Sequence, residues 1–62
     1  MNDIDYLLNE YRDRIDMLQS AVAAGNCTSF DEYKHTCGQI RGLESACMLI
    51  TDLKKRMEES DD

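Results

Sequence analysis

The side chains best suited to chemistry in this chain are three cysteines and one histidine. They are Cys27, His35, Cys37 and Cys47, separated in turn by eight, two and ten residues. Structural zinc sites take their ligands in closely spaced pairs, and these separations match no compact zinc pattern. Cys37 and Cys47 are expected instead at a helix interface, where a free cysteine behaves as a small apolar residue. The sequence therefore predicts no metal and no cofactor.

Two pairs of carboxylates, Asp13 with Asp16 and Asp31 with Glu32, have the form of an acid–base site. Helix surfaces and helix starts favour acidic residues for ordinary electrostatic reasons. No spacing sets a nucleophile or a base beside either pair, and His35 is expected at the surface. No glycine-rich loop follows a strand, so a nucleotide site is unsupported as well. We expect a protein without enzymatic activity.

Length and charge narrow the remaining classes of function. The chain has 62 residues and a net charge of -6, with no Trp and no Pro. A chain this short buries too little apolar surface to be comfortably stable alone, so self-association or a partner is expected. The acidic balance argues against direct binding to nucleic acid. Neither a membrane span nor a signal peptide is visible, so a cytosolic location with reduced cysteines is expected.

The first helix is predicted over residues 3–24. An apolar row recurs every three or four residues and stays within one stripe of a helix. The row consists of Ile4, Leu8, Tyr11, Ile15, Leu18 and Val22. Glu10 and Arg14 have the spacing of a favourable pair on the helix surface. Asn2 or Asp3 can cap the start, and Gly25 with Asn26 can end the helix.

A second helix is predicted over residues 30–58. Ser29 and Glu32 have the spacing of a capping box. The short connection predicts an all-α fold, a two-helix antiparallel hairpin over a single domain, 1–62, with 59–62 a frayed acidic tail. One apolar stripe of the second helix should face the first helix, pairing Val22 with Tyr33 at the loop and Ile4 with Ile50 at the far end. This stripe consists of Tyr33, Cys37, Ile40, Leu43, Cys47 and Ile50.

The second helix also carries an apolar stripe that a simple hairpin does not need. We call it the second stripe: Gly38, Gly42, Ala46, Leu49 and Leu53, with Met57 continuing it. It lies about 120° around the helix from the first stripe and cannot face the same neighbour. A glycine inside a solvated helix costs about 1 kcal/mol relative to Ala, so two of them suggest that another backbone approaches closely. The alternative is that the glycines accommodate the first helix or mark a kink.

The arrangement Y-x4-G-x-I-x-G-L in the second helix resembles small helical proteins of tailed bacteriophages, especially short-tailed ones. The resemblance is carried by Phe30, Asp31, Glu32, Tyr33, Gly38, Gln39, Ile40, Arg41, Gly42, Leu43, Ala46, Ile50, Asp52 and Leu53. It implies a protein made in the host bacterial cytoplasm and either built into the virion or acting on a host protein. It carries over no catalytic residue.

Two functions follow as hypotheses. In the first, a non-catalytic interaction module docks through the second stripe and Met57, by self-association or on a larger protein, as a virion or assembly component. In the alternative, the chain is a phage regulator that binds and inhibits a host protein. Its acidic surface would then occupy a basic nucleic-acid site through Asp13, Asp16, Asp52, Glu58 and Glu59. Neither hypothesis requires direct contact with nucleic acid or a membrane.

Overall fold

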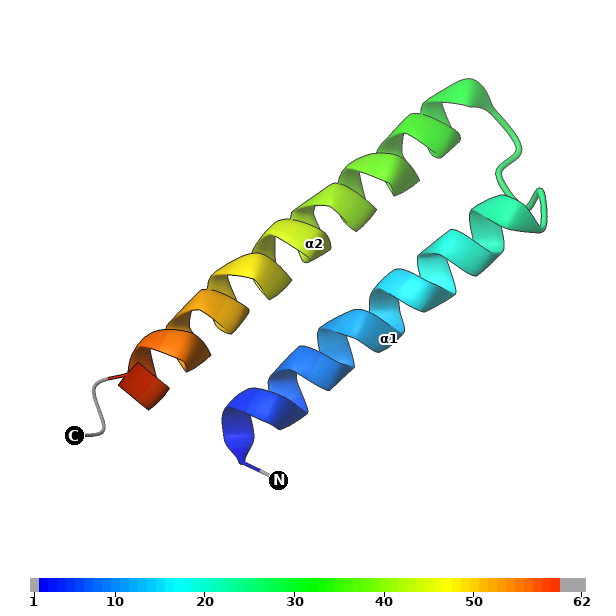
Figure 1. The fold of residues 1–62 in the computed structure, drawn as a ribbon. Coiled ribbons are helices and arrows are strands. Elements are labelled where there is room, and N and C mark those ends of the chain that lie inside the picture. Colours follow the sequence, from blue (N-terminus) through cyan, green and yellow to red (C-terminus); the bar gives the residue numbers. More distant parts are fainter. Residues whose placement is uncertain (1, 60–62) are drawn as a thin grey trace.

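A computed structural model of the chain describes residues 2–59 and consists of two helices, α1 (Asp3–Ala23) and α2 (Phe30–Glu59). The helices lie side by side and run in opposite directions (Figure 1), which confirms the predicted all-α hairpin. α2 ends at Glu59, one residue beyond its predicted end at 58, and the frayed tail predicted over 59–62 stays a prediction. The rest of that tail, 60–62, lies outside the described residues.

Both ends of α1 are set by short-range hydrogen bonds. The Asn2 side chain accepts a hydrogen bond of 2.8 Å from the backbone amide of Asp5, which makes Asn2 the predicted cap. At the other end Gly25 has φ of +75°, and the amides of Gly25 and Asn26 donate to carbonyls of the last turn. This is a Schellman motif, which favours glycine at the left-handed position. Asn26 does not share the positive φ.

The start of α2 uses Ser29 as predicted, but Glu32 reaches one residue further back. The Ser29 hydroxyl oxygen accepts from the amide of Glu32 at 3.1 Å. The Glu32 carboxylate accepts from the hydroxyl of Thr28 at 2.6 Å and from its amide at 3.2 Å. These hydrogen bonds, the hydroxyl first, lower the pKa of Glu32 below its ordinary value. The loop is thereby tied to the first turn of α2.

The two helices meet along the predicted apolar rows. Every member of the α1 row is half-buried, except Leu8, which at 6% exposure is the one buried side chain among the described residues. On α2 the half-buried members are Cys37, Ile40, Leu43, Cys47 and Ile50. Tyr33 is 44% exposed. The core is therefore a single seam, narrow even for a chain of this size.

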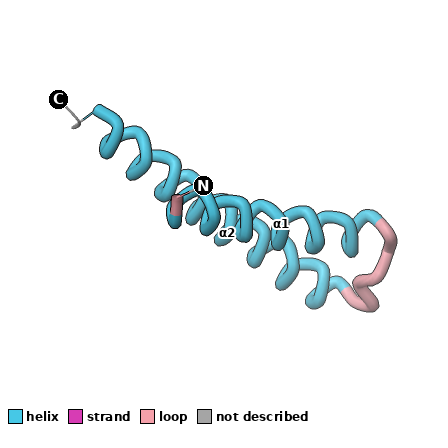
Figure 2. Tube along the Cα trace, turned by 90° about the horizontal axis from the view of Figure 1, so that it is seen from below, coloured by secondary structure: helices cyan, strands magenta, loops and turns pink. Residues whose placement is uncertain are grey.

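The register of the seam differs from the predicted one by about one helical turn. Lys54 forms an ion pair with Asp5, and Ile4 lines a common hollow with Lys54 and Met57 instead of lying opposite Ile50. The reason lies at the loop, because the first turn of α2 extends beyond the end of α1 and is exposed. At the other end α2 still runs past the start of α1 (Figure 2), as its greater length predicts.

The hairpin is one layer thick. Its dimensions are 52 × 19 × 13 Å, and the smallest is close to the diameter of one helix with its side chains, about 10–12 Å. Stable domains usually bury their apolar surfaces between two or more layers. Both broad faces of this hairpin are therefore open, and the side chains on them decide what the protein can bind.

Candidate protein-interaction face

The second stripe lies on α2 away from the seam and is largely exposed. Leu49 is 71% exposed, Leu53 50% and Met57 52%, while Ala46 is half-buried. These large apolar side chains meet water in an isolated hairpin. Their exposure is unfavourable, because each square ångström of apolar surface left in water costs about 25 cal/mol.

Gly38 and Gly42 do not serve the contact with α1. A Cβ atom built on either glycine would meet no other atom within 4 Å, apart from its own helix backbone and chain neighbours. The alternative that these glycines accommodate the first helix is therefore wrong. Nor is there a break, because α2 is continuous from Phe30 to Glu59. Both glycines leave shallow depressions in an exposed helix surface.

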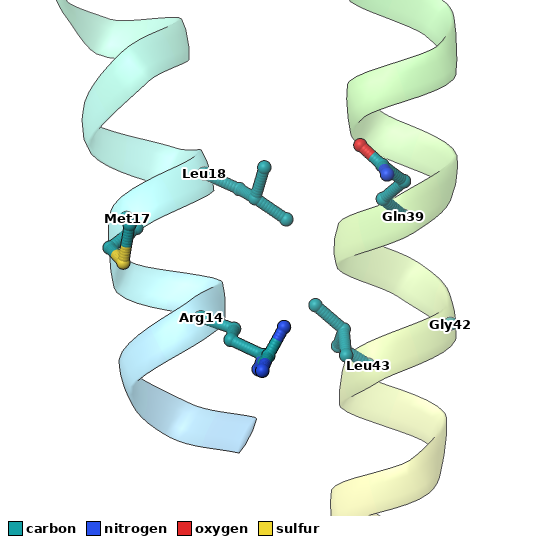
Figure 3. Close-up of a pocket in the computed structure, with 6 residues that line it drawn as sticks. All are labelled: Arg14, Met17, Leu18, Gln39, Gly42 and Leu43. Carbon is teal, nitrogen blue, oxygen red and sulfur yellow. The ribbon is translucent and has the colours of Figure 1, made fainter. Parts of the chain in front are cut away.

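Residues of α1 extend the stripe into a face. Two adjoining hollows lie on one side of the hairpin, and Arg14 and Leu43 line both of them. Gly42 and Met17 line the first hollow, and Leu7 lines the second. Figure 3 shows Arg14, Leu18, Gln39 and Leu43 directed into the space between the helices, with Gly42 at the edge of α2. Met17 is 71% exposed and Leu7 46%. We call this surface, the second stripe with Leu7, Met17 and Met57, the open face.

Leu7 and Met17 are not among the site residues that the sequence predicts. A signal for them exists, since Leu7, Glu10, Arg14 and Met17 are separated by three, four and three residues, which places them along one flank of a helix. The predicted row of α1 is instead the one that faces α2. The flank becomes recognisable as part of a site only because the hollows join its members to Gly42 and Leu43.

The opposite face of the hairpin carries a hollow lined by three charged side chains. Arg12 lies on the flank of α1 opposite Arg14, because two residues turn a helix by about 200°. It lines a hollow with Met48, Asp52 and Lys55, and Asp52 is bound to Arg56 at 3.2 Å. Met48 is 73% exposed and is the one large aliphatic side chain among the residues that line this hollow. This hollow therefore has fewer large apolar side chains than the hollows of the open face, although Tyr6 and Phe30, which are 60% and 71% exposed, also lie outside the open face.

The structure does not bring the three cysteines and His35 together in one site. The three cysteines are half-buried free thiols, and His35 is exposed. Within residues 2–59 no three side chains of His, Cys, Asp or Glu gather as a metal site would require. Asp13 and Asp16 are exposed on α1. No helix of the described chain has the length and apolar character needed to cross a membrane.

Comparisons with protein-family models, with curated proteins and with solved structures found no significant match to this chain. The open face offers apolar contact, two glycine depressions and two side chains of opposite charge, Glu10 and Arg14, beside the hollows. These are the means of binding a protein surface.

Proposed function

We propose that this chain is a non-catalytic protein–protein interaction module that docks through the open face. The observation that carries the proposal is the exposure of Leu49 and Leu53 on a hairpin only one layer thick. Large exposed apolar surfaces on small proteins mark interaction sites. Covering these side chains would stabilise a complex by several kcal/mol, at about 25 cal/mol per Å².

We further propose that the module is a small virion or assembly component of a tailed bacteriophage, made in the host cytoplasm. The support is the resemblance of the segment from Phe30 to Leu53 to phage proteins, together with the shape of the molecule. A small hairpin with an exposed apolar surface such as the open face can bind at equivalent positions in a symmetric assembly. The regulator is the second candidate, but Asp52, one of its proposed acidic contacts, is already bound to Arg56.

The test is the presence of the protein in purified particles of the phage that encodes it. Particles are banded on a density gradient, and the protein is quantified by mass spectrometry for the wild type, Gly42→Leu and Met48→Leu. We expect a fixed number of copies in wild-type particles, their loss with Gly42→Leu, and no change with Met48→Leu on the opposite face. If the protein stays entirely outside the particles and binds one host protein, the regulator is the correct function.

A further inference from the structure

The open face is self-complementary along α1. Glu10 and Arg14 carry opposite charges, and Leu7 and Met17 flank them at equal distances. If a second copy of α1 lies antiparallel on this row, with the midpoint of the contact at the height of Arg12, Glu10 faces the second copy's Arg14, and Leu7 faces its Met17. Glu10 and Arg14 form no ion pair with each other within the described residues, although they were predicted to do so. Both charges remain available to a partner.

The second stripe is self-complementary as well, in size instead of charge. Its first half is small, with Gly38 and Gly42, and its second half is large, with Leu49 and Leu53. An antiparallel copy of α2 centred beside Ala46 places Leu49 on the second copy's Gly42 and Leu53 on its Gly38. The depressions are open, since a Cβ at either glycine meets nothing within 4 Å. Large side chains entering holes in a facing helix are the usual packing of helix bundles.

The midpoint of the proposed α1 contact and the midpoint of the proposed α2 contact lie at the same height in the hairpin. A single two-fold axis can serve both helices only if Arg12 on α1 is level with Ala46 on α2. The structure meets this condition, because Leu18 and Arg14 share a hollow with Gln39 and Leu43 (Figure 3), and a register that sets Arg14 level with Leu43 sets Arg12 level with Ser45, the neighbour of Ala46. The ion pair between Asp5 and Lys54 sets Arg12 level with Cys47, which is the same register to within about two residues, or about 3 Å of helix rise. The charge pattern and the size pattern therefore share one axis.

The amount of exposed surface agrees with a missing partner of this size. A compact monomer of 7.1 kDa is expected to expose about 4,100 Å² of accessible surface. This hairpin exposes 5035 Å². The difference is close to the 800 Å² or so that each partner contributes to a stable interface of standard size.

We propose that the partner of the open face is a second copy of this chain, stacked face to face with its helices antiparallel to form a two-fold symmetric four-helix bundle. This inference rests on the proposed function, because it names the first partner of the same face. In the bundle α1 packs on α1 and α2 on α2, and each contact occurs twice. The end of α2 that runs past the start of α1 is covered by the first turns of the second copy's α2.

Two charge variants test this geometry, Glu10→Arg and Arg14→Glu. Each alone sets like charges against each other at both ends of the α1 contact, so each homodimer should dissociate about tenfold more readily or worse. In an equimolar mixture, the arginine introduced into one chain should face the glutamate introduced into the other, which restores association. Native mass spectrometry should then find about nine-tenths heterodimer, where random pairing of equal affinity gives about one half. Effects within one helix cannot produce this, because each chain keeps its own like charges.

Wild-type protein that stays monomeric at all concentrations overturns the dimer, and so does a random assortment of the two variants. The particle experiment separates this outcome from failure of the proposed function. If the protein is monomeric and its entry into particles is lost with Gly42→Leu, the dimer is excluded and the docking function stands. If the charge variants pair selectively but the protein never enters particles, the bundle is supported and the virion role is excluded.

Discussion

Asp5 and Lys54 form an ion pair across the two helices, with 2.6 Å between Oδ1 and Nζ. The contact joins the start of α1 to α2 one turn beyond Ile50, in a register that sets Arg12 level with Cys47, next to Ala46. The hydrogen bond from Lys54 to Asp5, followed by the charge of Asp5, raises the pKa of Lys54 above its ordinary value. The ion pair is thus a local measure of the register on which the proposed bundle depends.

Carbodiimide coupling should join Asp5 to Lys54. The reagent activates a carboxylate, and an amine already in contact with it forms the amide. Tandem mass spectrometry of the coupled protein should identify this link in the monomer band, and Lys54→Arg should remove it. Lys34 provides the control, because it lies in the first turns of α2, at the opposite end of the hairpin from Asp5. Equal coupling of Asp5 to Lys34 would mean that the register is different.

The hydrogen bonds at the start of α2 predict a pH dependence. The pKa of Glu32 is lowered, so its stabilising effect is fully present above its ordinary pKa and is lost as the pH falls through the lower, folded value. Thr28→Ala removes the hydroxyl that contributes most and should raise the Glu32 pKa. Carboxyl NMR titration measures this directly. Thr36→Ala is the control, since the Thr36 hydroxyl donates to the Glu32 backbone carbonyl at 3.0 Å and should leave the carboxylate unchanged.

Replacement of Gly25 tests the turn. Ala at φ of +75° is strained, so Gly25→Ala should lower the free energy of unfolding by about 1 kcal/mol. Gly25→Asn should cost less, because Asn tolerates the left-handed region better than Ala does. Urea unfolding followed by circular dichroism compares the two. Equal losses for Ala and Asn would show that the turn does not depend on the positive φ.

A charge in the seam should unfold the hairpin. Ile15 is half-buried between the helices, and Ile15→Asp would force a carboxylate into apolar surroundings without a partner. We expect far-UV circular dichroism to show loss of most helix. Gln19→Asp, at an exposed position of the same helix, should remain folded. A fully helical Ile15→Asp protein would contradict the described seam.

Complementary size changes test the contact between the two α2 helices. Gly42→Leu should place its added side chain against Leu49 of the second copy, and Leu49→Ala should leave the Gly42 depression unfilled. Each variant should dimerise at least tenfold more weakly than wild type, as measured by sedimentation velocity. Their mixture should recover a dimer, since the one chain's leucines fill the other's small positions. Lack of recovery would mean that Leu49 and Gly42 do not meet.

Much of the fold follows from local patterns in the sequence. The apolar row from Ile4 to Val22 and the cap residues Asn2 and Ser29 are local features, and the structure confirms them. The register depends on how the loop turns, and the Schellman motif at Gly25 leaves the first turn of α2 beyond α1, which no residue spacing specifies. Leu7 and Met17 could not be assigned to the site from the sequence, because the open face is formed by both helices and depends on their register.

The most direct measurement is the solution mass of the purified protein by light scattering across a wide concentration range, with Gly42→Leu beside the wild type. The wild type should approach twice the 7.1 kDa chain mass, while Gly42→Leu should remain monomeric and helical, because a Cβ atom at this exposed position meets no other atom of the hairpin within 4 Å. A stably folded wild type at the mass of one chain throughout, or a Gly42→Leu variant that dimerises equally well, would contradict the account.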